Sequence, residues 1–195
     1  SKAAKKRYFK RALKSRMKQL ASRRVAQMRE ENDRPKFSFD PSAEMELILA
    51  AGDSRKDSLI IDIDGTLLSY QIGNIKHRRP KIRPFYKEFV EQLKQRVNLF
   101  IFSAGAPIRT KNLFVKYFKG DFQGYFDRNH LQRGRKCFAQ FDNGQKRILV
   151  LDDTDSAVHP WSKANHVSIS RWMGDDQDTG LLSALQDVQL RLDLK

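Results

Sequence analysis

Short apolar runs alternate with amphipathic segments through most of the chain beyond residue 57. Four runs have the length and content of buried strands: 58–63, 97–102, 148–151 and 166–169. Apolar residues at helical spacing predict helices over 84–96, over 107–118, and from 178 or 179 to about 192. The order β-α-β-α-β-β-α predicts an α/β fold, a Rossmann-like open and mainly parallel sheet with helices on both faces.

The first 31 residues follow a different pattern. They contain no Pro or Gly and consist mostly of good helix formers. One narrow apolar stripe recurs at spacings of four, four and three: Phe9, Leu13, Met17 and Leu20. Pro35 breaks this pattern, and Ser42 is a candidate cap for a short helix that Gly52 ends. We therefore expect a basic helical arm over 1–31, a linker with a short helix over 32–57, and a globular domain over 58–195.

Charge is distributed unevenly along the chain. The formal net charge is +15, and residues 1–29 contribute +12 because they carry twelve Lys or Arg and no Asp or Glu. Such an arm favours polyanionic partners, so we expect it to bind RNA or a ribonucleoprotein, a ribosome included, by neutralising phosphates. The candidate contact residues are Lys5, Lys6, Arg7, Lys10, Arg11, Lys14, Arg16, Lys18, Arg23 and Arg24. A membrane surface or a calmodulin-type partner is the alternative, which the narrow apolar stripe favours less.

Composition restricts the class of protein and its compartment. A chain of 195 residues with 39% hydrophobic content and 13 Phe can build a folded core. No stretch approaches the ~18–20 consecutive apolar residues of a transmembrane helix. Cys137 is the single cysteine, which excludes an internal disulfide and predicts an intracellular, reducing compartment. The acid-free basic N-terminal region is typical of a mitochondrial presequence and also of a nuclear import signal, and we expect the mitochondrion ahead of the nucleus.

Two carboxylates follow the first predicted strand in the motif Asp62-Ile63-Asp64-Gly65-Thr66. Gly65 permits the backbone to turn, so both carboxylates can face one pocket. The first can attack phosphorus while it binds a metal ion, and the second can protonate a leaving oxygen and later deprotonate water. The alternative is a plain turn rich in Asp and Gly.

Polar residues also end two other predicted strands. Ser103-Ala104-Gly105 offers a hydroxyl and backbone N–H groups for a phosphate oxygen, although a plain loop has the same composition. Asp152-Asp153 supplies a second acidic pair, whose burial requires a cation. Because ligands bind at the carboxyl ends of parallel strands, we expect these groups to meet. Oxygen donors without Cys or His pairs at zinc spacing indicate Mg²⁺.

Together these residues resemble the haloacid-dehalogenase (HAD) superfamily. The resemblance is closest to the small phosphatases that act on the C-terminal domain of RNA polymerase II, and it covers about 58–192. Arg83-Pro84-Phe85 is similar to a helix start of that branch, and Lys136 lies sixteen residues before Asp152, at the family's spacing for its phosphate-binding lysine. The closing segment from His159-Pro160 to Leu182 also follows the family pattern.

The resemblance implies a role for each matching residue. Asp62 would be the nucleophile that forms an aspartyl-phosphate, Asp64 the general acid and base, and Thr66 the residue that orients the loop. Ser103 and Lys136 would hold phosphoryl oxygens, although the neighbouring cations of Arg133-Gly134-Arg135 are alternatives to Lys136. The resemblance further implies a Mg²⁺ site, formed by Asp62, the backbone carbonyl of Asp64, Asp152 and Asp153.

Two departures concern substrate selectivity. Gly65 stands where that branch usually has Glu, and only Leu67 to Arg79 precedes the Arg83-Pro84 segment. We expect this short interval to lack the small sheet that shapes the family's peptide cleft. Two hypotheses follow: a Mg²⁺-dependent phosphatase that its arm docks on RNA or a ribonucleoprotein, and a HAD-fold protein with unused catalysis that serves as a structural or assembly component of a ribonucleoprotein or ribosome.

Overall fold

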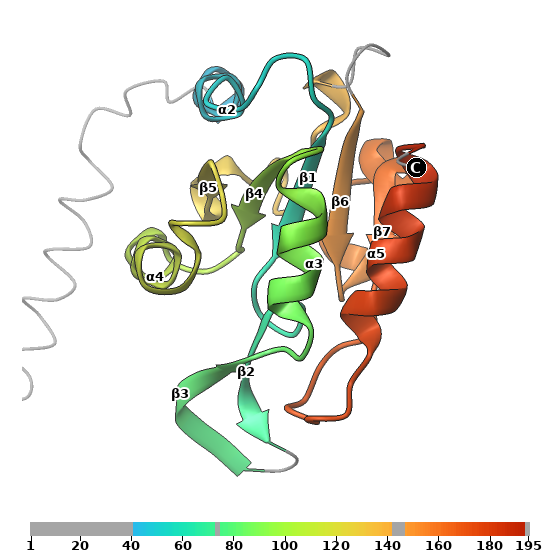
Figure 1. The fold of residues 1–195 in the computed structure, drawn as a ribbon. Helices are drawn as coiled ribbons and strands as arrows, with labels where there is room; N and C mark the ends of the chain where they lie inside the picture. The colour runs from blue at the N-terminus through green and yellow to red at the C-terminus, as the bar shows by residue number, and fades with distance from the viewer. Residues whose placement is uncertain (1–40, 73–74, 142–146, 194–195) are drawn as a thin grey trace, which may run out of the picture. The chain divides into compact units, whose positions relative to one another are not determined.

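A five-stranded, fully parallel sheet organises the part of the chain that the computed structural model describes, residues 41–72, 75–141 and 147–193 (Figure 1). The strand order is β5–β4–β1–β6–β7. The strands are β1 (Ser58–Asp62), β4 (Asn98–Phe102), β5 (Gly124–Phe126), β6 (Ile148–Asp152) and β7 (His166–Ser168). The arm over 1–31 and its candidate RNA contacts lie outside the described residues.

The three central strands are buried along their whole length and pack on both faces. Successive side chains of a strand point to opposite faces, so each strand contributes to two apolar cores. Leu59 and Ile61 of β1 lie in the larger core, whereas Ile60 lies in the smaller one with Phe100 and Val150. Burial on both faces explains why these strands read as continuous apolar runs in the sequence.

Helices cover both faces of the sheet, as predicted. The larger core packs beneath α3 (Tyr86–Leu93), α5 (Gly180–Arg191) and α4 (Pro107–Leu113), which continues as one π-helical turn over Phe114–Phe118 (Figure 1). On the other face lies α2 (Pro41–Leu49), whose Met45 is fully buried in the smaller core. The compact unit therefore extends ahead of residue 58 and includes the short helix that the sequence placed in a linker segment.

The sequence predicted the α/β class and the four strands β1, β4, β6 and β7, but not every boundary. Phe85 adopts a left-handed conformation with φ 62°, so α3 begins at Tyr86 rather than at Pro84. The helix over 41–49 begins at Pro41, ahead of the candidate cap Ser42. The three-residue edge strand β5 is too short to show a periodic pattern.

An antiparallel hairpin follows the first strand, and here the expectation from the sequence was wrong. We expected no small sheet between Leu67 and Arg79, yet β2 (Leu68–Ile72) pairs with β3 (Ile75–Ile82) (Figure 1). The pairing register shifts between Ser69 and Gln71, and β3 consists mainly of basic residues with one proline. Both features weaken the two-residue alternation by which a strand is recognised.

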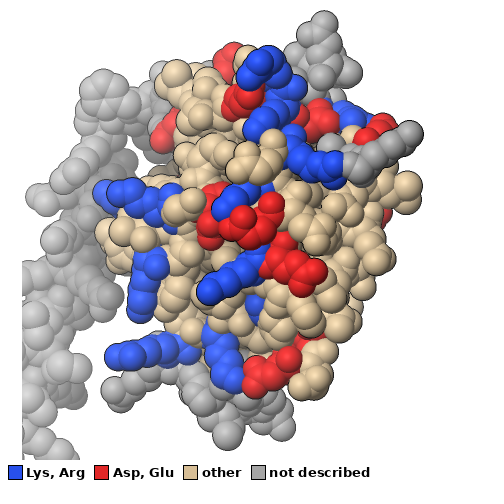
Figure 2. All heavy atoms as spheres, in the orientation of Figure 1, with Lys and Arg blue, Asp and Glu red and all other residues tan. Residues whose placement is uncertain are grey.

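The surface of this unit carries both signs of charge. On the face that Figure 2 shows, acidic and basic side chains lie among large uncharged areas. This agrees with the sequence beyond residue 29, where only +3 remains once the +12 of residues 1–29 is subtracted from the total of +15. None of the helices in the described ranges is long and apolar enough to cross a membrane.

Candidate active site

The three polar strand ends meet at one edge of the sheet because the strands are parallel and in register. Asp62 lies opposite Phe102 of β4, so Ser103 follows at the same edge. Ile61 lies opposite Leu151 of β6, which places Asp152 beside Asp62. The order of the strands thus brings together residues that are about 40 to 90 positions apart in the chain.

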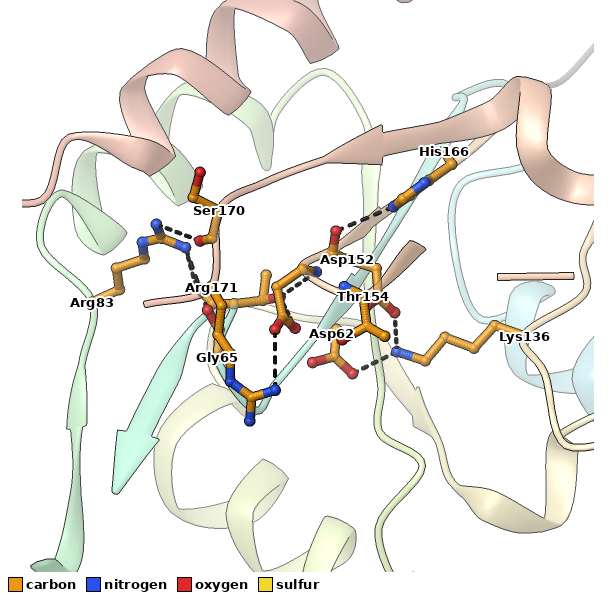
Figure 3. A network of polar contacts seen from close by, with 11 residues as sticks. Asp62, Gly65, Arg83, Lys136, Asp152, Thr154, His166, Ser170 and Arg171 are labelled. Carbon is orange, nitrogen blue, oxygen red and sulfur yellow. Dashed lines mark hydrogen bonds and ion pairs between the residues drawn. The ribbon is translucent and has the colours of Figure 1, made fainter. Parts of the chain in front are cut away.

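A buried lysine joins two of these carboxylates. Lys136 Nζ donates to Asp62 Oδ1 at 2.5 Å and to Asp152 Oδ2 at 2.6 Å, and its side chain is 1% exposed (Figure 3). Arg133 and Arg135 are exposed, so of the three candidate cations only Lys136 enters the site. A tight turn directs it there: Gln132 and Arg135 exchange backbone hydrogen bonds around Gly134 at φ 75°.

The segment that carries Lys136 is fixed against the loop that follows β6. The Lys136 N–H donates to the Ala157 carbonyl, and the His159 N–H donates to the Lys136 carbonyl, both at 2.8 Å. These bonds hold the backbone of Lys136 in place, so its amine reaches the carboxylates as an inflexible part of the site.

Thr66 orients Asp153, the acidic residue that directly follows β6. Its hydroxyl donates to Asp153 Oδ1 at 3.3 Å and accepts from the Asp153 N–H at 3.2 Å. Asp153 Oδ2 is buried and makes no hydrogen bond; Arg171 Nη1 approaches it to 3.7 Å. A buried carboxylate oxygen without a hydrogen bond is unusual, and an open ligand position for a cation or a water explains it.

The electrostatics of the cluster give the same indication. Asp62, Asp152 and Asp153 bring carboxylate oxygens within 4.8 Å of one another. Burial raises the pKa of Asp62 to about 7, against the attraction of Lys136 and with the help of the Asp152 charge. Burial and the Asp152 charge also raise the pKa of Asp153. The cations beside the three carboxylates are buried Lys136 and the mostly exposed Arg171, so negative charge is in surplus and the hard oxygen donors fit a Mg²⁺ ion.

Gly65 is required by this arrangement. It adopts φ 88°, and a Cβ on it would lie 2.8 Å from Asp153 Oδ2. A side chain there would collide with the candidate metal ligand, and the backbone conformation itself disfavours one.

Asp64 lies at the mouth of the site rather than among the buried carboxylates. Its side chain is 40% exposed and pairs with Arg109, whose Nη1 and Nη2 donate to Oδ2 and Oδ1 at 2.8 and 2.5 Å. Ser103 is 1% exposed and accepts the Gly105 N–H at 3.1 Å through its hydroxyl, which shapes the Ser103–Gly105 loop. All the candidate catalytic and metal-binding residues predicted from the sequence thus lie around one edge, with Asp64 on its solvent side.

Three arginines of the site were not predicted. Arg83 is 1% exposed and joins the loop that follows β1 to the segment before α5, through the Thr66 carbonyl at 3.2 Å and Asp178 at 2.6 Å. Figure 3 shows Arg171 extending toward the acidic cluster. Arg109 lies in the first turn of α4. Its position six residues after Ser103, just beyond a strand-end loop, was the available sign in the sequence that it lies near the site.

The acid-bearing strand ends, the carboxylate–lysine cluster and the parallel sheet define a phosphatase domain with the HAD-type α/β fold. The model of the family "NLI interacting factor-like phosphatase" matches residues 57–193. The chain therefore belongs to the NLI interacting factor-like phosphatase family.

Two of the solved structures that match part of the chain are RNA polymerase II CTD phosphatases. One is the fission yeast RNA polymerase II CTD phosphatase Fcp1, in a variant bound to beryllium fluoride, with 15% identity, a TM-score of 0.46, and coverage of 79% of this chain and 54% of that chain. The other is Fcp1, an essential RNA polymerase II CTD phosphatase, with 16% identity, a TM-score of 0.47, and coverage of 76% and 53%. The chain thus spans just over half the length of these relatives. No curated protein matches it.

Proposed function

We propose that the domain is a Mg²⁺-dependent phosphomonoester hydrolase that works through an aspartyl-phosphate on Asp62. The observation that carries this proposal is the pair of buried carboxylates around Lys136, next to an Asp153 oxygen that makes no hydrogen bond. Phosphoryl transfer depends on positioning the reacting groups and on neutralising negative charge. Lys136 supplies a positive charge next to the candidate nucleophile, and the free oxygen of Asp153 offers a ligand for a metal ion.

In the first half of the reaction, an Asp62 oxygen attacks phosphorus and the bond from phosphorus to the leaving oxygen breaks. Asp64 donates a proton to that oxygen, which leaves as an alcohol or phenol. The Lys136 ammonium, together with the Ser103 hydroxyl and the backbone N–H groups of its loop, binds the other phosphoryl oxygens, where negative charge develops.

In the second half, water attacks the phosphorus of the aspartyl-phosphate and transfers a proton to Asp64. The bond between phosphorus and the Asp62 oxygen breaks, so inorganic phosphate leaves and the carboxylate is restored. The solvent exposure of Asp64 suits both proton transfers, since its side chain lies where the leaving group departs and water enters.

Asp62, Asp153 and the backbone carbonyl of Asp64 would hold Mg²⁺. When bound, the ion neutralises phosphoryl charge and positions the phosphoryl group for in-line attack. Asp152 is also within reach, but its oxygens already accept from Lys136 at 2.6 Å and from the Thr154 N–H at 2.8 Å. This bonding favours Asp152 as the residue that positions Lys136.

The test is hydrolysis of 4-nitrophenyl phosphate by the full chain with Mg²⁺ and with a chelator. We expect activity that depends on Mg²⁺ and is lost in Asp62→Asn, whereas Asp187→Asn, in an exposed pair on α5, keeps it. Wild-type activity no greater than that of Asp62→Asn would reject the proposal.

We also propose that the arm over residues 1–31 docks the domain on RNA or a ribonucleoprotein, in the mitochondrion or the nucleus. The twelve cations of residues 1–29 support this, because such a chain neutralises phosphates without reading bases. The same feature supports the second candidate, a structural or assembly component of a ribonucleoprotein. The two differ in one result: the assembly role predicts that Asp62→Asn restores function in cells that lack the protein.

A further inference from the structure

Arg109 lies between Asp64 and the Ser103–Gly105 loop. Both terminal nitrogens of its guanidinium donate to Asp64, at 2.8 and 2.5 Å. On its other side the guanidinium lies against the Ser103–Gly105 loop, since a Cβ on Gly105 would lie 2.9 Å from Arg109 Nη1. The absence of a side chain at Gly105 is therefore what lets Arg109 reach Asp64.

This ion pair is at the mouth of the site and not in its interior. The Arg109 and Asp64 side chains are 35% and 40% exposed, and the guanidinium lies 5.6 Å from the centre of the Tyr70 ring. Arg83 differs, because it is buried and its N–H groups bind backbone carbonyls and Asp178. A structural role explains Arg83, whereas Arg109 is accessible to a ligand.

A cavity adjoins Asp64. Its volume is about 240 Å³, and its lining includes Asp64, Tyr70, Arg171, Trp172 and Met173. The Arg171 side chain is 62% exposed there. A leaving group that takes a proton from Asp64 would enter this cavity. Arg171 lines the cavity, and Arg109 is bonded to the Asp64 carboxylate.

We propose that Arg109 is a specificity-determining residue that binds a second anionic group, a carboxylate or a phosphate, carried by the leaving group of the substrate. The planar fork of a guanidinium matches both anions as it matches Asp64. Binding the anion exchanges the partner of Arg109 and frees the Asp64 oxygens for proton transfer. This proposal rests on the phosphatase function proposed above.

A matched pair of substrates tests it. In 4-carboxyphenyl phosphate and 4-carbamoylphenyl phosphate the leaving groups have nearly the same shape and differ by one charge. We expect the wild-type chain to prefer the carboxylate roughly tenfold in kcat/KM, the ratio that one charge-assisted hydrogen bond supplies. Arg109→Gln should bring the ratio close to one. Lys111→Gln removes an exposed cation from the same helix and should keep it.

Binding provides a readout independent of turnover. In the Asp62→Asn background with Mg²⁺, calorimetry should give the same preference in Kd, and the added Arg109→Gln should abolish it. A wild-type ratio near one, or a preference that survives Arg109→Gln, overturns the assignment. A preference in Kd without turnover by the wild-type chain would reject the phosphatase function and keep Arg109 as an anion-binding residue. Equal melting temperatures of the variants exclude misfolding as the cause.

Discussion

Asp62 is a carboxylate in a place that disfavours its charge. Burial raises its pKa to about 7, although Lys136 lies 2.5 Å away. Charged groups of one sign destabilise a buried site unless an ion compensates them. The residues that would perform catalysis therefore reduce the stability of the metal-free protein. Replacing one of these charges should raise the free energy of unfolding.

Without metal, we predict that Asp62→Asn stabilises the fold at neutral pH. The pKa of Asp62 is raised from 3.8 to about 7, so the folded state holds a proton that the unfolded state loses. Wild-type stability should fall as pH rises from about 4 to about 7, and the variant should lack this contribution. The gap between their free energies of unfolding in chelator should widen across this range and stay constant above it. A gap that does not change with pH would contradict the raised pKa.

For Asp153 we predict a loss of metal binding without a loss of fold. Asp153→Asn keeps the shape that Thr66 binds and removes one of few charged ligands. Mg²⁺ should raise the melting temperature of the wild-type chain by mass action and have little effect on the variant. Exposed Asp176 provides the matched control, Asp176→Asn. An equal response to Mg²⁺ in Asp153→Asn and wild type would mean that the acidic cluster is not the metal site.

At the scale of elements, Arg83 connects parts of the chain that the strand order alone leaves separate. It donates to the Thr66 carbonyl after β1, to the Ser170 carbonyl after β7, and to Asp178 before α5. Gly180 allows this, because a Cβ there would lie 2.3 Å from Arg83 Nη2. The loop that follows β1 is thus held by the segment that leads into the last helix.

Arg83→Met should destabilise the domain by about 3–5 kcal/mol, because it leaves the partly buried Asp178 and two carbonyls without their donor. Lys81→Met, in the exposed pair with Asp176, should cost less than about 1 kcal/mol. Urea denaturation of both variants measures the difference. Equal effects would show that the Arg83 network contributes no more than a surface ion pair.

The sequence determines the elements better than their connections. Apolar runs located β1, β4, β6 and β7, and the signal was clearest for the three central strands β1, β4 and β6, which are buried on both faces. The β2–β3 hairpin was missed because its strands are polar and its register is irregular. Within the site, the strand-end acids were predictable from the parallel sheet. Lys136 was chosen over its neighbouring cations by its distance from Asp152 in the resembled family and not by any local pattern. The partners of Arg83 and Arg109 depend on tertiary contacts that no local pattern encodes.

At the scale of the whole molecule, the chain combines a domain of nearly balanced charge with a strongly basic N-terminal segment. Residues 1–29 hold +12 of the +15 net charge, and all the candidate catalytic residues lie beyond residue 61. The proposed polyanion binding and the proposed phosphate chemistry would thus lie in different parts of the chain, so they can be tested separately.

Deletion of residues 1–31 should remove RNA binding and keep catalysis. If about half of the twelve cations contact phosphates, the log–log slope of affinity against salt is roughly −4 to −6, with little dependence on RNA sequence. Affinity across a salt series for the full and truncated chains measures both effects. A truncated chain that binds RNA as tightly, or a full chain whose affinity ignores salt, would leave a protein or a membrane as the better partner.

The most direct test of the central claim is to trap the phosphoryl group on Asp62. In Asp64→Asn the second step lacks its base, while 4-nitrophenolate leaves without an acid, so the aspartyl-phosphate should accumulate. After an acid quench, peptide mass spectrometry should find one phosphoryl group on Asp62, labile to hydroxylamine and absent when Asp62→Asn is added. Turnover by the wild-type chain without this adduct in Asp64→Asn, or an adduct on another residue, would contradict the account.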